Sequence, residues 1–125
     1  MHDRLGMTLE RAALGLGWLG SASILVLSLV PGNERPHALS SGHAEHFLAY
    51  FVTAFCFSLG ARSPAGRWTA FASLSLVSAA VEVAQLWIPG RTGELDGFIF
   101  SSAGALAGTV AGLLALRFRA RPSLG

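Results

Sequence analysis

Long apolar blocks dominate this 125-residue chain and constrain its fold more than any other feature. Residues 12–30 contain no charged side chain over 19 positions, and residues 97–116 contain none over 20. Residues 68–88 span 21 positions and contain a single charge, Glu82. About 20 apolar residues in a helix cross the hydrocarbon core of a bilayer. These blocks therefore predict transmembrane helices rather than the core of a soluble domain.

A fourth block, residues 47–61, has only 15 residues but approaches membrane length when it is extended back through His46 to His43. Only 13% of all residues are charged, whereas roughly a quarter are charged in soluble domains. The short loops leave too little chain for a separate soluble core. We therefore predict one all-α domain over residues 1–125, a bundle of four transmembrane helices with short loops, with spans at about 12–30, 43–61, 68–88 and 97–116.

The arginines predict the orientation of this bundle. Seven of the nine lie in the N-terminal segment, the middle loop or the C-terminal segment: Arg4, Arg11, Arg62, Arg67, Arg117, Arg119 and Arg121. Only Arg35 and Arg91 lie in the other two loops. Because basic residues favour the cytoplasmic side, both termini are expected in the cytoplasm and the protein is expected to be multi-pass. No basic stripe interleaved with aromatic residues is present, so nucleic acid is not an expected partner.

Rare polar side chains cluster where this orientation places the outer face. With a rise of 1.5 Å per residue, Glu82 lies about 9 Å below the end of the third span and Gln85 about 4–5 Å below it. His43, His46 and Tyr50 have the i, i+3, i+7 spacing of one helical face at the start of the second span. A charge in a membrane-length apolar run costs roughly 2.5–3.5 kcal/mol on insertion scales, so Glu82 is expected to have a partner or a function.

The loop after the third span adds Arg91 and Asp96 to this predicted outward-facing site. An arginine there can bind a phosphate through two parallel hydrogen bonds. Each residue also has a structural interpretation: His46 and Tyr50 as part of an interfacial aromatic belt, Glu82 as a tie between helices, and Arg91 as an anchor to headgroups. The one-sided clustering of these residue types favours a functional site.

Three glycines in the last block, Gly104, Gly108 and Gly112, repeat at a spacing of four. This small-xxx-small pattern lets the backbones of two membrane helices approach closely. The pattern predicts tight packing inside the bundle or, alternatively, a homo-oligomer that forms through this face.

The order of the polar motifs resembles that of a known family. The segment His46-Phe47-Leu48-Ala49-Tyr50 is similar to the HFxxY element of the VanZ-like membrane proteins, and Glu82-Val83-Ala84-Gln85 with Ile88-Pro89-Gly90-Arg91 is similar to their ExxQ…PGR element. The resemblance runs from about residue 42 to residue 112. In the family's last element an acidic residue is typically followed four positions later by Asn. Here Asp96 is followed at that distance by Phe100, and Ser101 is the nearest polar residue.

The resemblance implies a small protein of the bacterial cytoplasmic (inner) membrane, with His46, Tyr50, Glu82, Gln85 and Arg91 carried over as site residues. The family is associated with resistance to the glycopeptide teicoplanin. The resemblance attaches no firm biochemical activity to these residues.

Three functions follow from these observations. We favour the binding or modulation of a lipid-linked cell-envelope component, with membrane lipids as partners. The second is a membrane-embedded enzyme that acts on a lipid phosphate or headgroup by acid–base catalysis with His46 and Glu82, although no complete nucleophile motif is present. The third is a structural or partner-binding subunit. A metal variant would use His43, His46 and Glu82 with Glu45 or Asp96, a spacing that is not a strong zinc pattern, and we expect neither a metal nor another cofactor.

Overall fold

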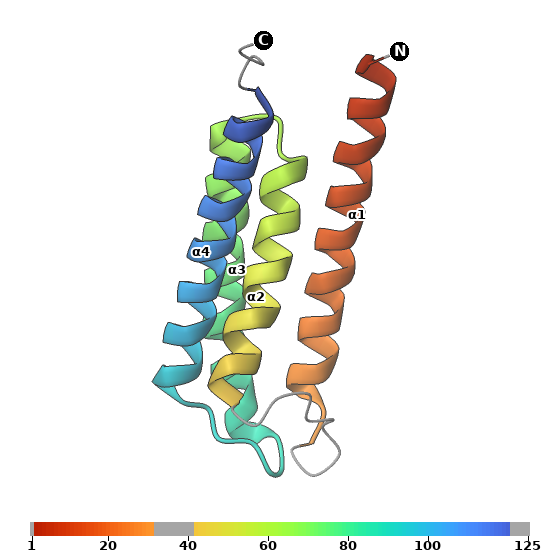
Figure 1. Cartoon of the computed structure of the whole chain (residues 1–125). Helices are drawn as coiled ribbons and strands as arrows, with labels where there is room; N and C mark the ends of the chain where they lie inside the picture. The colour runs from red at the N-terminus through yellow and green to blue at the C-terminus, as the bar shows by residue number, and fades with distance from the viewer. Residues whose placement is uncertain (1, 32–41, 121–125) are drawn as a thin grey trace.

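The computed structural model describes residues 2–31 and 42–120. These residues form four α-helices and one 3-10 turn: α1 His2–Leu29, α2 Gly42–Gly60, α3 Pro64–Ala84, η1 Gln85–Trp87 and α4 Leu95–Ala120. The predicted all-α class is confirmed, since no strand occurs in the described part of the chain. The helices alternate in direction, so the start of α1 and the end of α4 lie at one end of the bundle (Figure 1). Arg35 and Arg121, which entered the orientation argument, lie outside the described residues.

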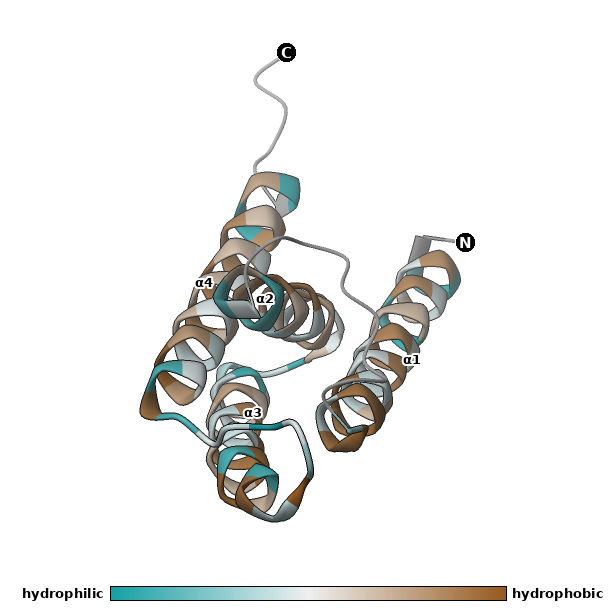
Figure 2. Ribbon diagram, turned by 90° about the horizontal axis from the view of Figure 1, so that it is seen from below, coloured by the Kyte–Doolittle hydropathy of each residue, from teal (hydrophilic) through white to brown (hydrophobic). Residues whose placement is uncertain are grey.

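Three of the helices are long and apolar enough to cross a membrane, within Asp3–Leu29, Pro64–Trp87 and Leu95–Arg119. Four such helices were predicted, and α2 does not reach the same hydropathy among the described residues. The reason lies in its first turn, where His43, Glu45 and His46 place polar side chains in a helix of only 19 residues. This helix lies among the other three and contacts all of them (Figure 2). Much of its surface therefore faces protein rather than lipid.

The bundle has small polar side chains inside and large apolar side chains outside. Its central apolar cluster is small and is formed by Ile24, Tyr50, Ala54, Leu74 and Ala105. Serine and threonine side chains are buried beside this cluster: Thr53, Ser58, Ser78, Ser101 and Thr109. Large apolar residues stand on the surface instead, among them Trp18 and Leu76, which are 69% and 71% exposed. This distribution suits a bundle surrounded by lipid, where small residues let helices approach and apolar side chains meet the acyl chains.

Local sequence signals explain where the middle helices begin and end. Ser63 is the N-cap of α3 and accepts a hydrogen bond from the Gly66 N–H at 3.0 Å, and Pro64 follows at the first helical position. At the end of α2, the buried Arg67 donates to the carbonyl oxygens of Ser58 and Ala61 at 3.1 and 3.2 Å. Those carbonyls have no partner within their own helix, so a side chain from α3 completes the end of α2.

The three glycines of α4 lie against α2 of the same chain, which is the most extensive helix contact in the bundle. A Cβ at Gly104 or Gly108 would collide with the carbonyl oxygen of Phe47 or Phe51, and one at Gly112 would collide with Ser58. The alternative of a homo-oligomer through this face does not fit the arrangement, because α2 already covers the face. The oligomeric state itself stays a prediction.

Candidate functional site

The predicted site residues lie at the end of the bundle where α1 and α3 end and α2 and α4 begin (Figure 1). His46 and Tyr50 come from α2, Glu82 from α3 and Gln85 from η1. The 3-10 turn of η1 replaces the last helical turn that the sequence predicted for this span. The chain then reverses through Pro89 and Gly90, and Gly90 adopts a positive φ of 74° that side-chain-bearing residues rarely adopt.

Tyr50 is the centre of a buried polar cluster. Tyr50 is 2% exposed, and its hydroxyl group lies near Ser78, Ser101 and the carboxyl group of Glu82. Ser101 also lies 3.2 Å from His46, between its Oγ and the Nδ1 of the imidazole ring. The hydroxyl group of Ser78 has no hydrogen-bond partner of good geometry among the described residues. The cluster therefore links α2, α3 and α4 with one hydroxyl group unsatisfied.

Glu82 is the most unusual member of this cluster. The residue is 8% exposed, and its Oε2 accepts a hydrogen bond from the backbone N–H of Glu94 at 3.0 Å. Its Oε1 is fully buried and has no hydrogen-bond partner in the described part of the chain. Gly97 lies directly against this carboxyl group, and a Cβ there would collide with it. Buried polar atoms are almost always satisfied in native proteins, so an unsatisfied carboxyl oxygen is an exception.

Gln85 and Arg91 have backbone partners on α1. The side-chain amide of Gln85, which is 3% exposed, donates to the Ser28 carbonyl at 3.0 Å. Arg91 donates through Nε to the carbonyl of Val30 at 2.9 Å and through its guanidinium Nη2 to the carbonyl of Leu27. These carbonyls belong to the end of α1, where intrahelical partners run out. Both side chains therefore hold the end of α1 through hydrogen bonds to its backbone.

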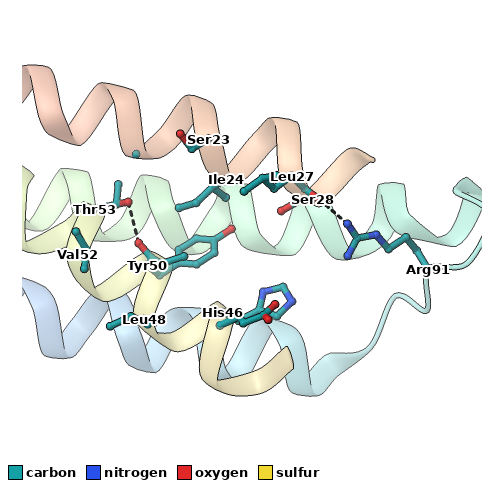
Figure 3. Close-up of a pocket in the computed structure, with 13 residues that line it drawn as sticks. Ser23, Ile24, Leu27, Ser28, His46, Leu48, Tyr50, Val52, Thr53 and Arg91 are labelled. Atoms are coloured by element: carbon teal, nitrogen blue, oxygen red, sulfur yellow. Dashed lines mark hydrogen bonds between the residues drawn. The ribbon is translucent and has the colours of Figure 1, made fainter. Parts of the chain in front are cut away.

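A groove of about 450 Å³ lies between α1 and α2 (Figure 3). Most of its wall is apolar, with Ile24 and Leu27 on one side and Leu48 and Val52 on the other. Polar side chains gather toward its outer end, namely Ser28, Glu45, His46 and Arg91. Its volume lies within the usual range of small-molecule sites, about 300–1,000 Å³.

Glu82 does not border this groove. It lines a second hollow of about 420 Å³ between the end of α3 and the start of α4, together with Val83, Leu86 and the loop residues Gly93 and Glu94. The residues of the buried cluster therefore open to different hollows. His46 and Tyr50 border the groove, Glu82 borders the second hollow, and Gln85 holds α1.

Three metal-ligating side chains come together at the outer end, and two of them, His43 and Asp96, were among the candidates from the sequence. His43, Glu94 and Asp96 offer ligand atoms that all lie within 4.8 Å of one another. His46 and Glu82 are not part of this group. The ring of His43 is stacked on Phe100, with 4.5 Å between the ring centroids. Because both carboxylates are exposed, this arrangement alone assigns no metal.

Sequence reasoning left out two residues that complete the buried cluster. Ser78 lies one helical turn before Glu82, so the i, i+4 spacing placed it on the same face. Ser101 was noted only as a substitute for a missing Asn, yet it contacts His46 directly. Serines in an apolar helix are too common to identify without a structure.

Comparison with known proteins identifies one family. A family model described as VanZ/LLP1 matches residues 17–116, which include both polar motifs, all of α2, α3 and η1, most of α4 and the latter part of α1. No curated protein matches the chain, and no solved structure does.

Proposed function

The chain belongs to the VanZ/LLP1 family, which is associated with glycopeptide resistance, and on this basis we propose that it binds a lipid-linked component of the cell envelope. The ligand's hydrocarbon chain would lie in the groove between α1 and α2, with its polar group at the outer end. In this proposal all four helices cross the bacterial cytoplasmic membrane and both termini are cytoplasmic. The arginine distribution supports this orientation.

The shape and polarity of the groove carry this proposal. Its wall is mostly apolar, and its charged and imidazole side chains, Glu45, His46 and Arg91, stand at one end, which matches the division of a lipid into tail and headgroup. Farther in, the hydroxyl groups of Ser23 and Thr53 donate to carbonyls of their own helices. Both helices that form it present large apolar side chains to the surroundings, among them Leu19, Val26 and Leu48. A hydrocarbon chain can therefore pass between groove and bilayer without crossing water, where each exposed CH₂ would cost about 0.8 kcal/mol.

Filling the groove tests the proposal. Val52 lines it and is 50% exposed, so Val52→Trp places a large side chain in the space of the lipid tail. We expect the variant to lose bound lipid by about tenfold, equivalent to 1.4 kcal/mol of affinity. The measurement is native mass spectrometry of protein released from gently extracted membranes.

The matched control is Val26→Trp, since Val26 is 63% exposed on α1 and does not line the groove. This variant should retain lipid as the wild type does. Equal lipid retention by both tryptophan variants, with both still folded, would rule out the groove as the binding site.

One observation favours an enzyme as a second candidate. The Oγ of Ser101 and Nδ1 of His46 are 3.2 Å apart, which is the separation of a nucleophile and its general base. This pair provides a nucleophile that the sequence motifs lacked. Ser101 is 0% exposed, however, so a substrate could reach it only after α2 and α4 separate.

Ser101→Ala separates the two functions. Under the binding proposal, the variant should keep wild-type lipid retention within about twofold, because Ser101 does not line the groove. Removal of a catalytic nucleophile would instead abolish turnover, with losses on the order of 10⁶ in known hydrolases. The assay incubates wild type and variant with a lipid phosphate and analyses the products by mass spectrometry. Product formed only by the wild type would establish the enzyme.

A further inference from the structure

The outer end of α1 is held by side chains of the η1 region. Arg91 and Gln85 donate to the carbonyls of Leu27, Ser28 and Val30. Arg91 lines the outer end of the groove and extends toward the end of α1 (Figure 3). The attachment of α1 at this end therefore depends on a guanidinium group that lies where a lipid headgroup would enter.

The inner half of α1 is attached differently, by close packing on α2. Gly17 and Gly20 lie so near Phe57 and Thr53 that a Cβ at either would collide with those side chains. The rings of Trp18 and Phe57 meet edge to face, with 5.4 Å between centroids. Ile24, 6% exposed, marks the outer limit of this packed region. Ile24 also lines the groove, which continues beyond it along Leu27 and Ser28.

The bonds that Arg91 makes to α1 can be displaced by a stronger acceptor. Its recorded acceptors on α1 are neutral carbonyl oxygens. Hydrogen bonds between a guanidinium group and a phosphate are charge-assisted and roughly twice as strong, and the planar fork suits two phosphate oxygens. A carbonyl released from the end of a helix can be hydrated at the membrane surface. A phosphate in the groove can therefore bias the position of α1.

We propose that Arg91 is a latch that exchanges the α1 carbonyls for the phosphate of a lipid, so that the end of α1 after Ile24 moves away and opens the groove sideways. This inference rests on the proposed function, because it assumes that the groove binds lipid. It adds the ligand class, a lipid with a phosphate headgroup, and the means by which the lipid gains entry. A ligand shifts such an equilibrium only by its differential affinity for the two states, which the exchanged hydrogen bonds supply.

The test measures the distance from α1 to the rest of the bundle. Spin labels are placed at exposed positions near the outer end by Leu29→Cys and Leu95→Cys, in a Cys56→Ser background. A control pair, Leu16→Cys and Leu114→Cys, reports on exposed positions away from the latch. The protein is held in maltoside micelles, which contain no phosphate. Dioleoyl phosphatidic acid, dioleoylglycerol or inorganic phosphate is then added.

We expect phosphatidic acid alone to lengthen the outer distance, by about 5 Å or one helical turn, and to leave the control pair unchanged. Arg91→Gln should show the longer distance without any addition and respond no further. Arg91→Lys should lie between the two, because lysine keeps the charge and loses the fork. An effect of inorganic phosphate equal to that of phosphatidic acid would overturn the assignment to a lipid.

Native mass spectrometry of the same samples separates the two proposals. If phosphatidic acid is retained and neither it nor Arg91→Gln changes the outer distance, the latch is wrong and lipid binding stands. If dioleoylglycerol is retained as well as phosphatidic acid, the groove binds lipid but the phosphate exchange is overturned. If neither lipid is retained, both proposals fail.

Discussion

Replacement of Gly108 by alanine is expected to destabilise the bundle by about 1–3 kcal/mol, although alanine is the better helix former. A methyl group at this position would collide with the carbonyl oxygen of Phe51 and approach the backbone nitrogen of Phe55. Backbone atoms of a packed helix cannot rotate aside as a side chain can, so α2 and α4 must separate. Since α2 also supports α1 and α3, loss of this contact affects the whole bundle.

Gly15→Ala is the matched control, because no atom lies within 4 Å of a Cβ built at Gly15. Gly15→Ala should leave the free energy of unfolding unchanged or raise it by up to about 1 kcal/mol, because alanine has the higher helix propensity. Unfolding in mixed micelles with increasing sodium dodecyl sulfate, followed by tryptophan fluorescence, measures both variants. A Gly108→Ala midpoint equal to or above that of Gly15→Ala would show that α2 and α4 do not approach this closely.

Glu82→Gln is expected to raise the free energy of unfolding by about 1 kcal/mol, whereas Glu82→Ala should lower it by about 2 kcal/mol. Glutamine keeps an oxygen for the N–H of Glu94, and a neutral amide costs less to bury than a carboxylate. It also removes a buried carboxyl group with one unsatisfied oxygen. Alanine leaves the Glu94 N–H without its acceptor and creates a cavity. Unfolding in mixed micelles with increasing sodium dodecyl sulfate, followed by tryptophan fluorescence, measures both Glu82 variants.

The sign of the glutamine result decides why a carboxyl group occupies this position. A variant that is more stable and has lost turnover on a lipid phosphate would show that Glu82 is kept for chemistry at a cost in stability. Greater stability with unchanged lipid retention would agree with the binding proposal. If glutamine and alanine destabilise equally, with lipid retention unchanged, Glu82 is a structural tie and the subunit interpretation gains support.

Parts of the fold could be predicted because they depend on local sequence. Uncharged runs of membrane length mark helices, and polar, proline or glycine residues mark their ends, as Ser63 and Pro64 do for α3. The same reasoning overestimated α2 as a span, because its length was counted through His43 and His46. In the structure that helix packs against the other three and keeps only part of its surface exposed, at residues such as Leu48 and Val52.

The site was predictable in its location but not in its contacts. Helix direction and residue depth placed His46, Tyr50 and Glu82 near one end, and they are there. Their partners depend on the rotation of each helix about its axis. The sequence of a largely apolar helix does not indicate that rotation. Glu82 consequently faces Glu94 and Gly97, and Arg91 reaches the end of α1.

The sequence alone determined the helical class, the polar end of the bundle and the family resemblance, because hydropathy, helix length and short motifs are read along the chain. The rotation of the helices, the groove and the partners of Arg91 and Glu82 depend on which surfaces pack together. That packing is set where glycines let backbones touch, at Gly104 and Gly108 against α2 and at Gly17 and Gly20 against its side chains. These contacts join residues distant in sequence, and their mutual fit exists only in the folded bundle.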